Sequence, residues 1–144
     1  NNPIENVKKS QRLLITWITD EPEVYAKIQR YITAVDFTED LYRKVASRLF
    51  EDLSKGTYNP AAIISMFSDE EEQREAAALF NTNLPQLNTK QEKEKAFHDI
   101  VYAVKKNSYE YFSGQLGADV NALNKVISGK KALEELAKTH ISLD

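Results

Sequence analysis

Residues 89–143 read TKQEKEKAFHDIVYAVKKNSYEYFSGQLGADVNALNKVISGKKALEELAKTHISL, and this stretch decides the fold. Its first four residues, 89–92, form a capping-box pattern at the start of a helical run. Apolar side chains then recur at the three- and four-residue spacing of one helix face. These positions are Phe97, Ile100, Val101, Val104, Tyr111, Phe112, Leu116, Leu123, Val126, Ile127, Leu133 and Leu136. The pattern predicts a long helix, then a turn at either Gly114 and Gly117 or Gly129, and one or two further helices.

The residues before this stretch predict short helices joined by turns. Helical periodicity covers residues 5–19, 21–31, 38–55, 60–67 and 69–80 approximately. Gly56 suits the end of the third helix, and Asn59 with Pro60 suits the start of the fourth. No segment alternates apolar and polar residues long enough to predict a strand. We therefore predict an all-α chain, with a helical bundle of about six helices over residues 1–108 and a C-terminal helical hairpin over residues 109–144.

Two of these helices have specific predicted starts. Thr38 is predicted to cap the third helix, with Phe37 packing on Tyr42 as a hydrophobic staple. Residues 68–71 (SDEE) are predicted to form a capping box that opens the fifth helix. The acidic side chains from Asp69 onward are consecutive, whereas calcium loops alternate their ligands, so we interpret them as stabilising the helix dipole.

Composition excludes several classes of function. The chain has 144 residues, 19 basic and 22 acidic side chains, a formal net charge of −3 and no cysteine. Without cysteine there are no disulfides or thiolate metal sites, which fits a reducing compartment such as the cytoplasm. No segment has the basic character that nucleic-acid binding needs, and no apolar run approaches the roughly 20 residues of a membrane span. The chain begins at Asn1 without a signal-peptide pattern or an initiator Met, so we expect it to be cut from a longer protein.

His98 and Asp99 form the most suggestive pair for chemistry, because such a pair on a helix opens the metal site of one class of phosphohydrolases. A metal site needs several converging ligands, however, and His140 is the only other histidine. We therefore interpret the pair as a surface feature, and predict no catalytic residue, no metal and no cofactor. The doublets Lys105-Lys106 and Lys130-Lys131 are interpreted as solvated helix faces or as the charged rim of an apolar contact.

Several residues at the starts, interiors and ends of the predicted helices follow one another in an order that points to a known family. Arg12-Leu13-Leu14 lies in the first predicted helix, and Pro22 begins the second. Phe37 precedes the cap of the third, and Tyr42-Arg43, Phe50, Leu53 and then Lys55-Gly56 at its end follow in order. A short apolar helix, an acidic helix and a long helix with a hairpin follow. In this order and spacing, nearly the whole chain resembles the C-terminal helicase-binding domain of bacterial DNA primase.

The resemblance implies a binding module rather than an enzyme, because primer synthesis in that family belongs to other parts of primase. It implies that the chain recruits primase to the hexameric replicative helicase during DNA replication and modulates both activities. It also implies a cytoplasmic protein without direct nucleic-acid or membrane binding, whose natural C-terminus is Asp144. From pattern alone, we predict that the last helix docks on the helicase. The predicted contacts are the apolar Leu133, Leu136, Ala137 and Ile141, and the rim lysines Lys130, Lys131 and Lys138.

Other interpretations stay open at the level of sequence. The chain could be the N-terminal domain of the replicative helicase itself, a small helical DNA-binding domain, or a metal hydrolase built on His98 and Asp99. A weak homodimer through the hairpin is a further expectation, because a terminal hairpin has few places to bury its apolar stripe.

Overall fold

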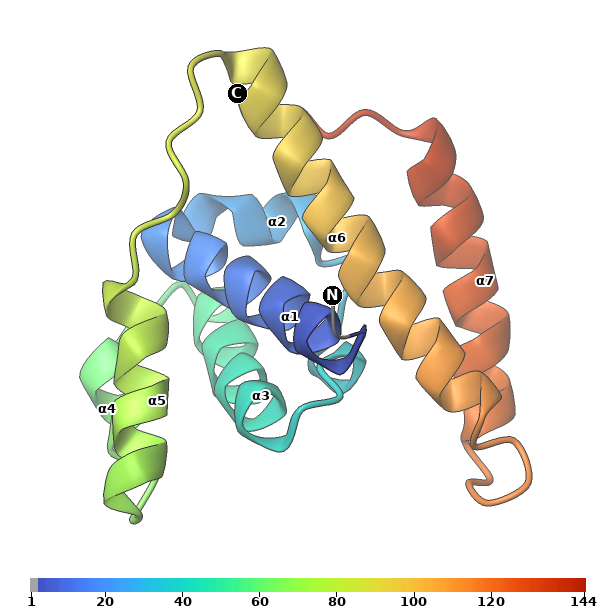
Figure 1. Cartoon of the computed structure of the whole chain (residues 1–144), viewed down its shortest axis with the longest axis horizontal. Helices are drawn as coiled ribbons and strands as arrows, with labels where there is room; N and C mark the ends of the chain where they lie inside the picture. The colour runs from blue at the N-terminus through green and yellow to red at the C-terminus, as the bar shows by residue number, and fades with distance from the viewer. Residues whose placement is uncertain (1–2) are drawn as a thin grey trace.

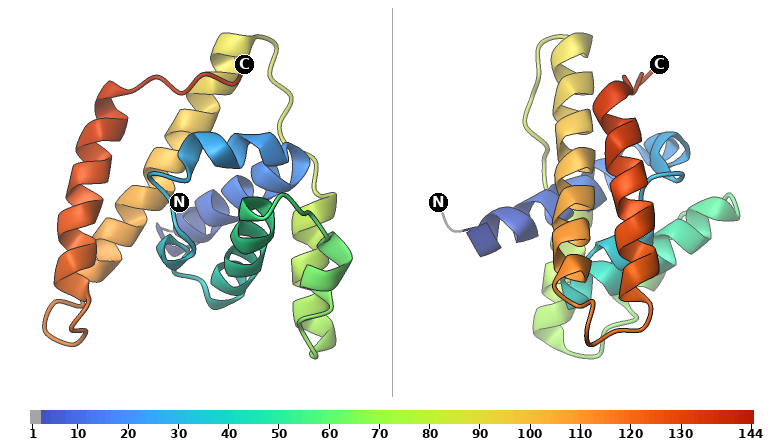
Figure 2. Two further views of the ribbon diagram at one scale, coloured as in Figure 1. Left: turned by 180° about the vertical axis from the view of Figure 1, so that it is seen from behind. Right: turned by 90° about the vertical axis from the view of Figure 1, so that its right-hand side faces the viewer.

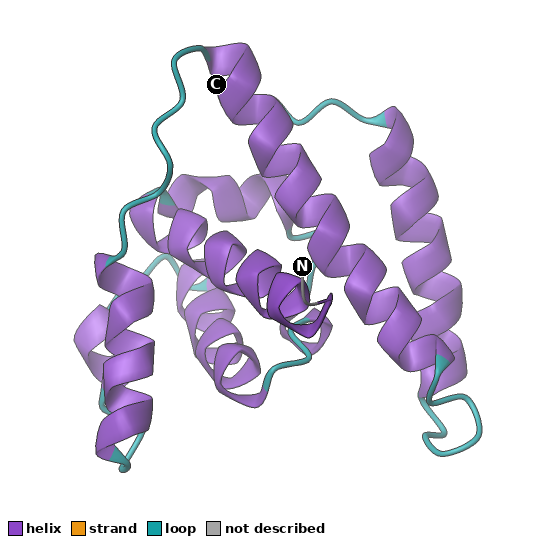
Figure 3. Cartoon of the chain, in the orientation of Figure 1, coloured by secondary structure: helices purple, strands orange, loops and turns teal. Residues whose placement is uncertain are grey.

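All regular structure in the described part of the chain is helical. The computed structural model describes residues 3–144, so Asn1 and Asn2, on which the interpretation of the chain start rested, lie outside it. Between residues 3 and 144 there are seven α-helices, two 3₁₀ helices and no strand (Figure 3), which confirms the all-α prediction. The elements in order are α1 (Pro3–Asp20), η1 (Pro22–Val24), α2 (Tyr25–Ile28), η2 (Ala34–Asp36), α3 (Asp40–Ser54), α4 (Pro60–Ile64), α5 (Glu70–Asn81), α6 (Lys90–Ser113) and α7 (Ala122–Lys138). None of these helices is long and apolar enough to cross a membrane.

Side-chain caps start three helices close to where the sequence predicts them. Asn59 caps α4 and Thr89 caps α6, each accepting the backbone N–H three residues on, at 3.2 and 3.1 Å. For α5 the cap is Asp69 rather than Ser68, because the Asp69 carboxylate accepts the N–H of Glu72 at 3.0 Å. Each cap satisfies a donor that has no partner within the helix.

The predicted start of the third helix is wrong. α3 begins at Asp40, and the Thr38 hydroxyl instead accepts a hydrogen bond from Gln11 Nε2 of α1 at 2.8 Å. Phe37 is fully buried, and its ring meets that of Phe50 edge-on with the centroids 5.8 Å apart. Partners distant in sequence have therefore overridden a local capping signal.

α1 lies at the centre of the molecule (Figure 1). Its buried face carries Leu14, Ile15 and Ile18, each 0% exposed, and it packs against α3, α5 and α6. Near its C-terminal end, the Trp17 ring packs on Phe97 of α6 with the centroids 5.0 Å apart. Burial of such side chains is the main favourable contribution to folding.

α6 and α7 form the terminal hairpin, and they lie side by side in every view (Figures 1 and 2). The turn occupies residues 114–121, so it contains Gly114 and Gly117, whereas Gly129 lies inside α7. Gly129 allows the two helices to approach closely, because a Cβ atom at this position would stand 3.3 Å from Tyr109 Cδ1 of α6.

The hairpin shares its core with the rest of the bundle. The boundary predicted after residue 108 falls inside α6, so the first arm of the hairpin begins at Lys90. Leu136 of α7 and Ile141 beyond it belong to the same buried cluster as the α1 side chains. The division into two units remains a prediction.

Candidate functional site

The two histidines of the chain both tie α6 to the end of α7. His98 Nε2 lies 2.7 Å from the carbonyl oxygen of Leu136, and its Nδ1 lies 3.9 Å from Asp99 Oδ1. His140 Nε2 lies 2.9 Å from Glu94 Oε1. Among the described residues, no three His, Cys, Asp or Glu side chains converge into a group that could hold a metal ion.

The structure separates the predicted docking residues into buried and exposed members. Leu136 is 0% exposed and Ile141 is 5% exposed, so both belong to the core, which corrects their predicted place on an open surface. The physical reason is that α7 and the residues that follow it, 139–144 (the tail), fold back on α6. Leu133 is half-buried and Ala137 is exposed. The predicted rim lysines are all exposed: Lys130, Lys131 and Lys138. Partner contact by the exposed members stays a prediction.

The segment after α7 is held against α6 by polar contacts. Glu94, buried on α6, accepts the backbone N–H of Leu143 at 2.6 Å and also faces His140. The hydrogen bond from Leu143 is the main reason that the pKa of the Glu94 carboxyl lies below its usual value, and burial opposes it. At the chain end, Lys90 forms an ion pair with Asp144. The tail therefore closes over one end of the α6–α7 pair.

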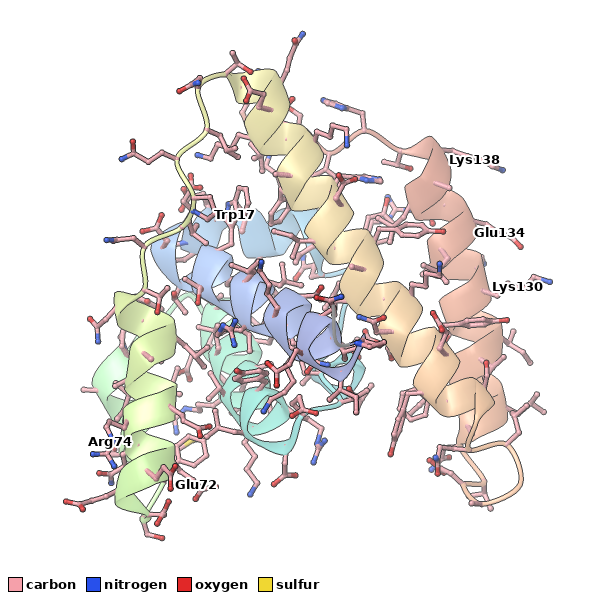
Figure 4. The ribbon with its side chains drawn as sticks, in the orientation of Figure 1. Trp17, Glu72, Arg74, Lys130, Glu134 and Lys138 are labelled. Carbon is pink, nitrogen blue, oxygen red and sulfur yellow. The ribbon has the colours of Figure 1, made fainter. Side chains whose placement is uncertain are left out.

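The face of α7 that points away from α6 changes character along its length. Lys130, Glu134 and Lys138 project outward from α7 (Figure 4). Leu123 and Ile127 continue the same stripe toward the turn, because steps of four, three, four and four residues return to one helix face. The stripe is charged near the tail and apolar near the turn.

Five large apolar side chains are exposed around the turn, and we call them the hairpin-tip patch. They are Tyr111 (49% exposed), Leu116 (50%), Val120 (95%), Leu123 (58%) and Ile127 (61%). Among the described residues these are half of the ten large apolar side chains that are exposed. The turn projects from the molecule at the lower right of Figure 1. Lys125 adds a positive charge beside the patch, with its Nζ 5.4 Å from the centre of the Phe112 ring.

The sequence prediction selected none of the patch for docking. Tyr111, Leu116, Leu123 and Ile127 belong to the apolar periodicity, but spacing alone does not say which apolar residues face α6. Val120 lies outside that periodicity. Its signal is a large apolar side chain inside a glycine-containing polar turn, where burial is rarely available.

The hairpin-tip patch leaves large apolar side chains in contact with water. Exposed apolar side chains at the end of a packed helical pair lose contact with water only when a partner covers them.

Comparison of the chain with protein-family models, curated proteins and solved structures gives no match.

Proposed function

We propose that this chain is a protein-docking module, the helicase-binding domain of a bacterial DNA primase, and that its hairpin-tip patch binds the hexameric replicative helicase. In this role it recruits primase to the helicase during DNA replication and modulates both activities. The observation that supports the proposal is the hairpin-tip patch, which gathers exposed apolar side chains at one end of a chain with a well-formed core elsewhere. Primer synthesis is not proposed for this chain.

The chemistry of the patch suits a helix-on-helix or helix-in-groove contact. Leu123 and Ile127 stand one helical turn apart on the outer face of α7, and Val120 is almost fully exposed just before that helix. Desolvating three side chains of this size contributes on the order of 5 kcal/mol. Lys130 continues the stripe at the edge of the patch, where an exposed charge affects the rate of association more than the affinity.

The test is binding of the cognate helicase hexamer to a Leu123→Asp/Ile127→Asp double variant, measured by calorimetry and by a sizing column. We expect affinity to fall about 100-fold, because both positions lie at the centre of the proposed contact. The circular dichroism spectrum should stay that of the wild type, since both side chains are exposed.

Met66→Asp is the matched control, because Met66 is an apolar side chain 42% exposed in the segment between α4 and α5. It should bind the helicase as the wild type does. Wild-type affinity in the double variant, or equal loss in the control, would overturn the assigned surface, and a wild-type chain that does not bind helicase would overturn the function. The sizing run without helicase also tests the predicted weak homodimer.

A further inference from the structure

A groove lies across the molecule from the hairpin-tip patch. It has a volume of about 800 Å³ and runs between the C-terminal end of α1, the start of α6 and the connection from α5 to α6. Its walls are Trp17, the acidic pair Asp20 and Glu21, Lys93, and residues 83–88 of the connection. Figure 1 places this connection and the hairpin turn on opposite sides of the molecule. A ligand in the groove would therefore leave the tip free.

One wall of the groove is a backbone segment with open hydrogen-bonding groups. Residues 83–88 form no helix or strand, and their backbone N–H and C=O groups make no hydrogen bond to any other group of the described chain. The amide side chains of Asn83, Gln86 and Asn88 are exposed on the same segment. Unpaired backbone groups in a non-helical segment can pair with a second peptide that lies beside them.

Trp17 lies in the wall of the same groove. Its side chain is only 3% exposed, and the indole Nε1 is buried without a hydrogen-bond partner in the described chain. Figure 4 shows Trp17 beside the connection that forms the opposite wall. A ligand atom in the groove cannot reach this buried N–H, so Trp17 contributes the apolar surface of its ring to the wall.

The charges at the groove select the kind of peptide. Glu21 is already paired, because its carboxylate accepts a hydrogen bond from Lys93 Nζ at 2.9 Å. Asp20 is exposed and has no ion-pair partner among the described residues. Leu84 and Leu87 add apolar surface from the connection. The groove therefore suits an apolar side chain together with a lysine or arginine.

We propose that this groove binds an extended peptide segment of a partner protein. The peptide pairs with the backbone of residues 83–88, packs an apolar side chain on Leu84 and Leu87, and places a basic side chain against Asp20. This site is separate from helicase docking and stands whether or not that function is correct.

The probe is the peptide acetyl-TVKLKV-amide, titrated into the ¹⁵N-labelled chain and followed by NMR. The chain has a single tryptophan, so one indole N–H signal reports on Trp17 alone. We expect that signal and the backbone amides of residues 83, 84 and 86–88 to shift and saturate together, Pro85 having no N–H. The charge-reversed acetyl-TVELEV-amide, and a version of the basic peptide with alternate amides N-methylated, should each bind about tenfold more weakly.

Two variants separate the proposed contacts. Leu87→Ser removes apolar surface that the peptide is proposed to cover, and should weaken binding of the basic peptide about fivefold. Asp20→Asn should remove the preference for the basic over the acidic peptide, whereas Glu70→Gln, an exposed carboxylate at the start of α5, should leave it unchanged.

The absence of saturable shifts, equal binding of the three peptides, or shifts confined to residues outside the groove would each overturn the proposal. Helicase binding by Asp20→Asn should equal that of the wild type, which distinguishes failure of this site from failure of the docking function.

Discussion

His98 Nε2 lies 2.7 Å from the carbonyl oxygen of Leu136, and this contact joins the two arms of the terminal hairpin. The carbonyl belongs to the last turn of α7, where such groups lack a full set of partners within the helix. An imidazole protonated at Nε2 donates to it. On the sequence alone, His98 is a candidate for metal chemistry and Leu136 is a candidate for docking. In the fold, both hold α7 against α6.

Leu136→Ala should lower the free energy of unfolding by about 2–5 kcal/mol, because it leaves a cavity at a position with 0% exposure. Denaturant unfolding measures this difference. Lys138→Ala, two residues on and exposed, is the control and should change stability by less than about 0.5 kcal/mol. A Leu136→Ala chain as stable as the control would place Leu136 outside the core.

Asp36 anchors η2 to α6 through a buried polar cluster. Its carboxylate accepts hydrogen bonds from Lys105 Nζ at 3.2 Å and from Ser108 Oγ at 2.7 Å, and it is 3% exposed. Asp36→Ala should lower stability by about 3–5 kcal/mol, because it leaves the Lys105 ammonium buried without a counter-charge. Chemical denaturation provides the measurement.

The control for this cluster removes both charges. The Asp36→Leu/Lys105→Met double variant should be more stable than Asp36→Ala, since no unpaired charge remains buried. A double variant that is the less stable of the two would contradict this account, because it would show that an unpaired Lys105 ammonium costs less than the side-chain contacts that the second substitution removes.

Gly129→Leu should lower stability by about 1–3 kcal/mol, because the new side chain pushes on Tyr109, whose Cδ1 would lie 3.3 Å from an added Cβ. Thermal unfolding detects the change as a lower Tm. Gly117→Leu is the matched control, since an added Cβ there meets nothing within 4 Å. Equal effects at the two glycines would contradict close packing of α7 on α6.

Glu94 should make stability depend on pH in the acidic range. Its pKa in the folded chain lies below the usual value of 4.5, chiefly through the hydrogen bond from Leu143, so the stabilisation is present above 4.5 and is lost as the pH falls through the lower, folded value. Glu94→Gln should therefore be less stable than the wild type at neutral pH, with a gap that narrows as the pH falls below 4.5.

Denaturant unfolding at several pH values checks this expectation. Glu110→Gln, an exposed substitution on the same helix, should show no such gap. A Glu94→Gln deficit that stays constant across the acidic range would mean that the Leu143 contact does not depend on the charge of the carboxylate.

Prediction from sequence succeeded where the signal is local. The cap at Thr89 and the cap at Asn59 follow from side chains that reach an N–H three residues away. Gly56, predicted at the end of the third helix, follows α3 with a positive φ. Prediction failed at Thr38, whose hydroxyl pairs with Gln11 Nε2 of another helix. Such a contact depends on how helices pack, and no local pattern contains that information.

The sequence by itself determined that the chain is helical and that its last third is a long helix followed by a turn, because periodicity, capping and glycine placement act within a few residues. Only the tertiary structure decided which side of α7 is buried. Its apolar side chains occupy more than one face, so Leu136 faces the core while Leu123 and Ile127 face water. The close approach at Gly129 and the contact from His98 select between those faces, and both depend on α6 lying alongside.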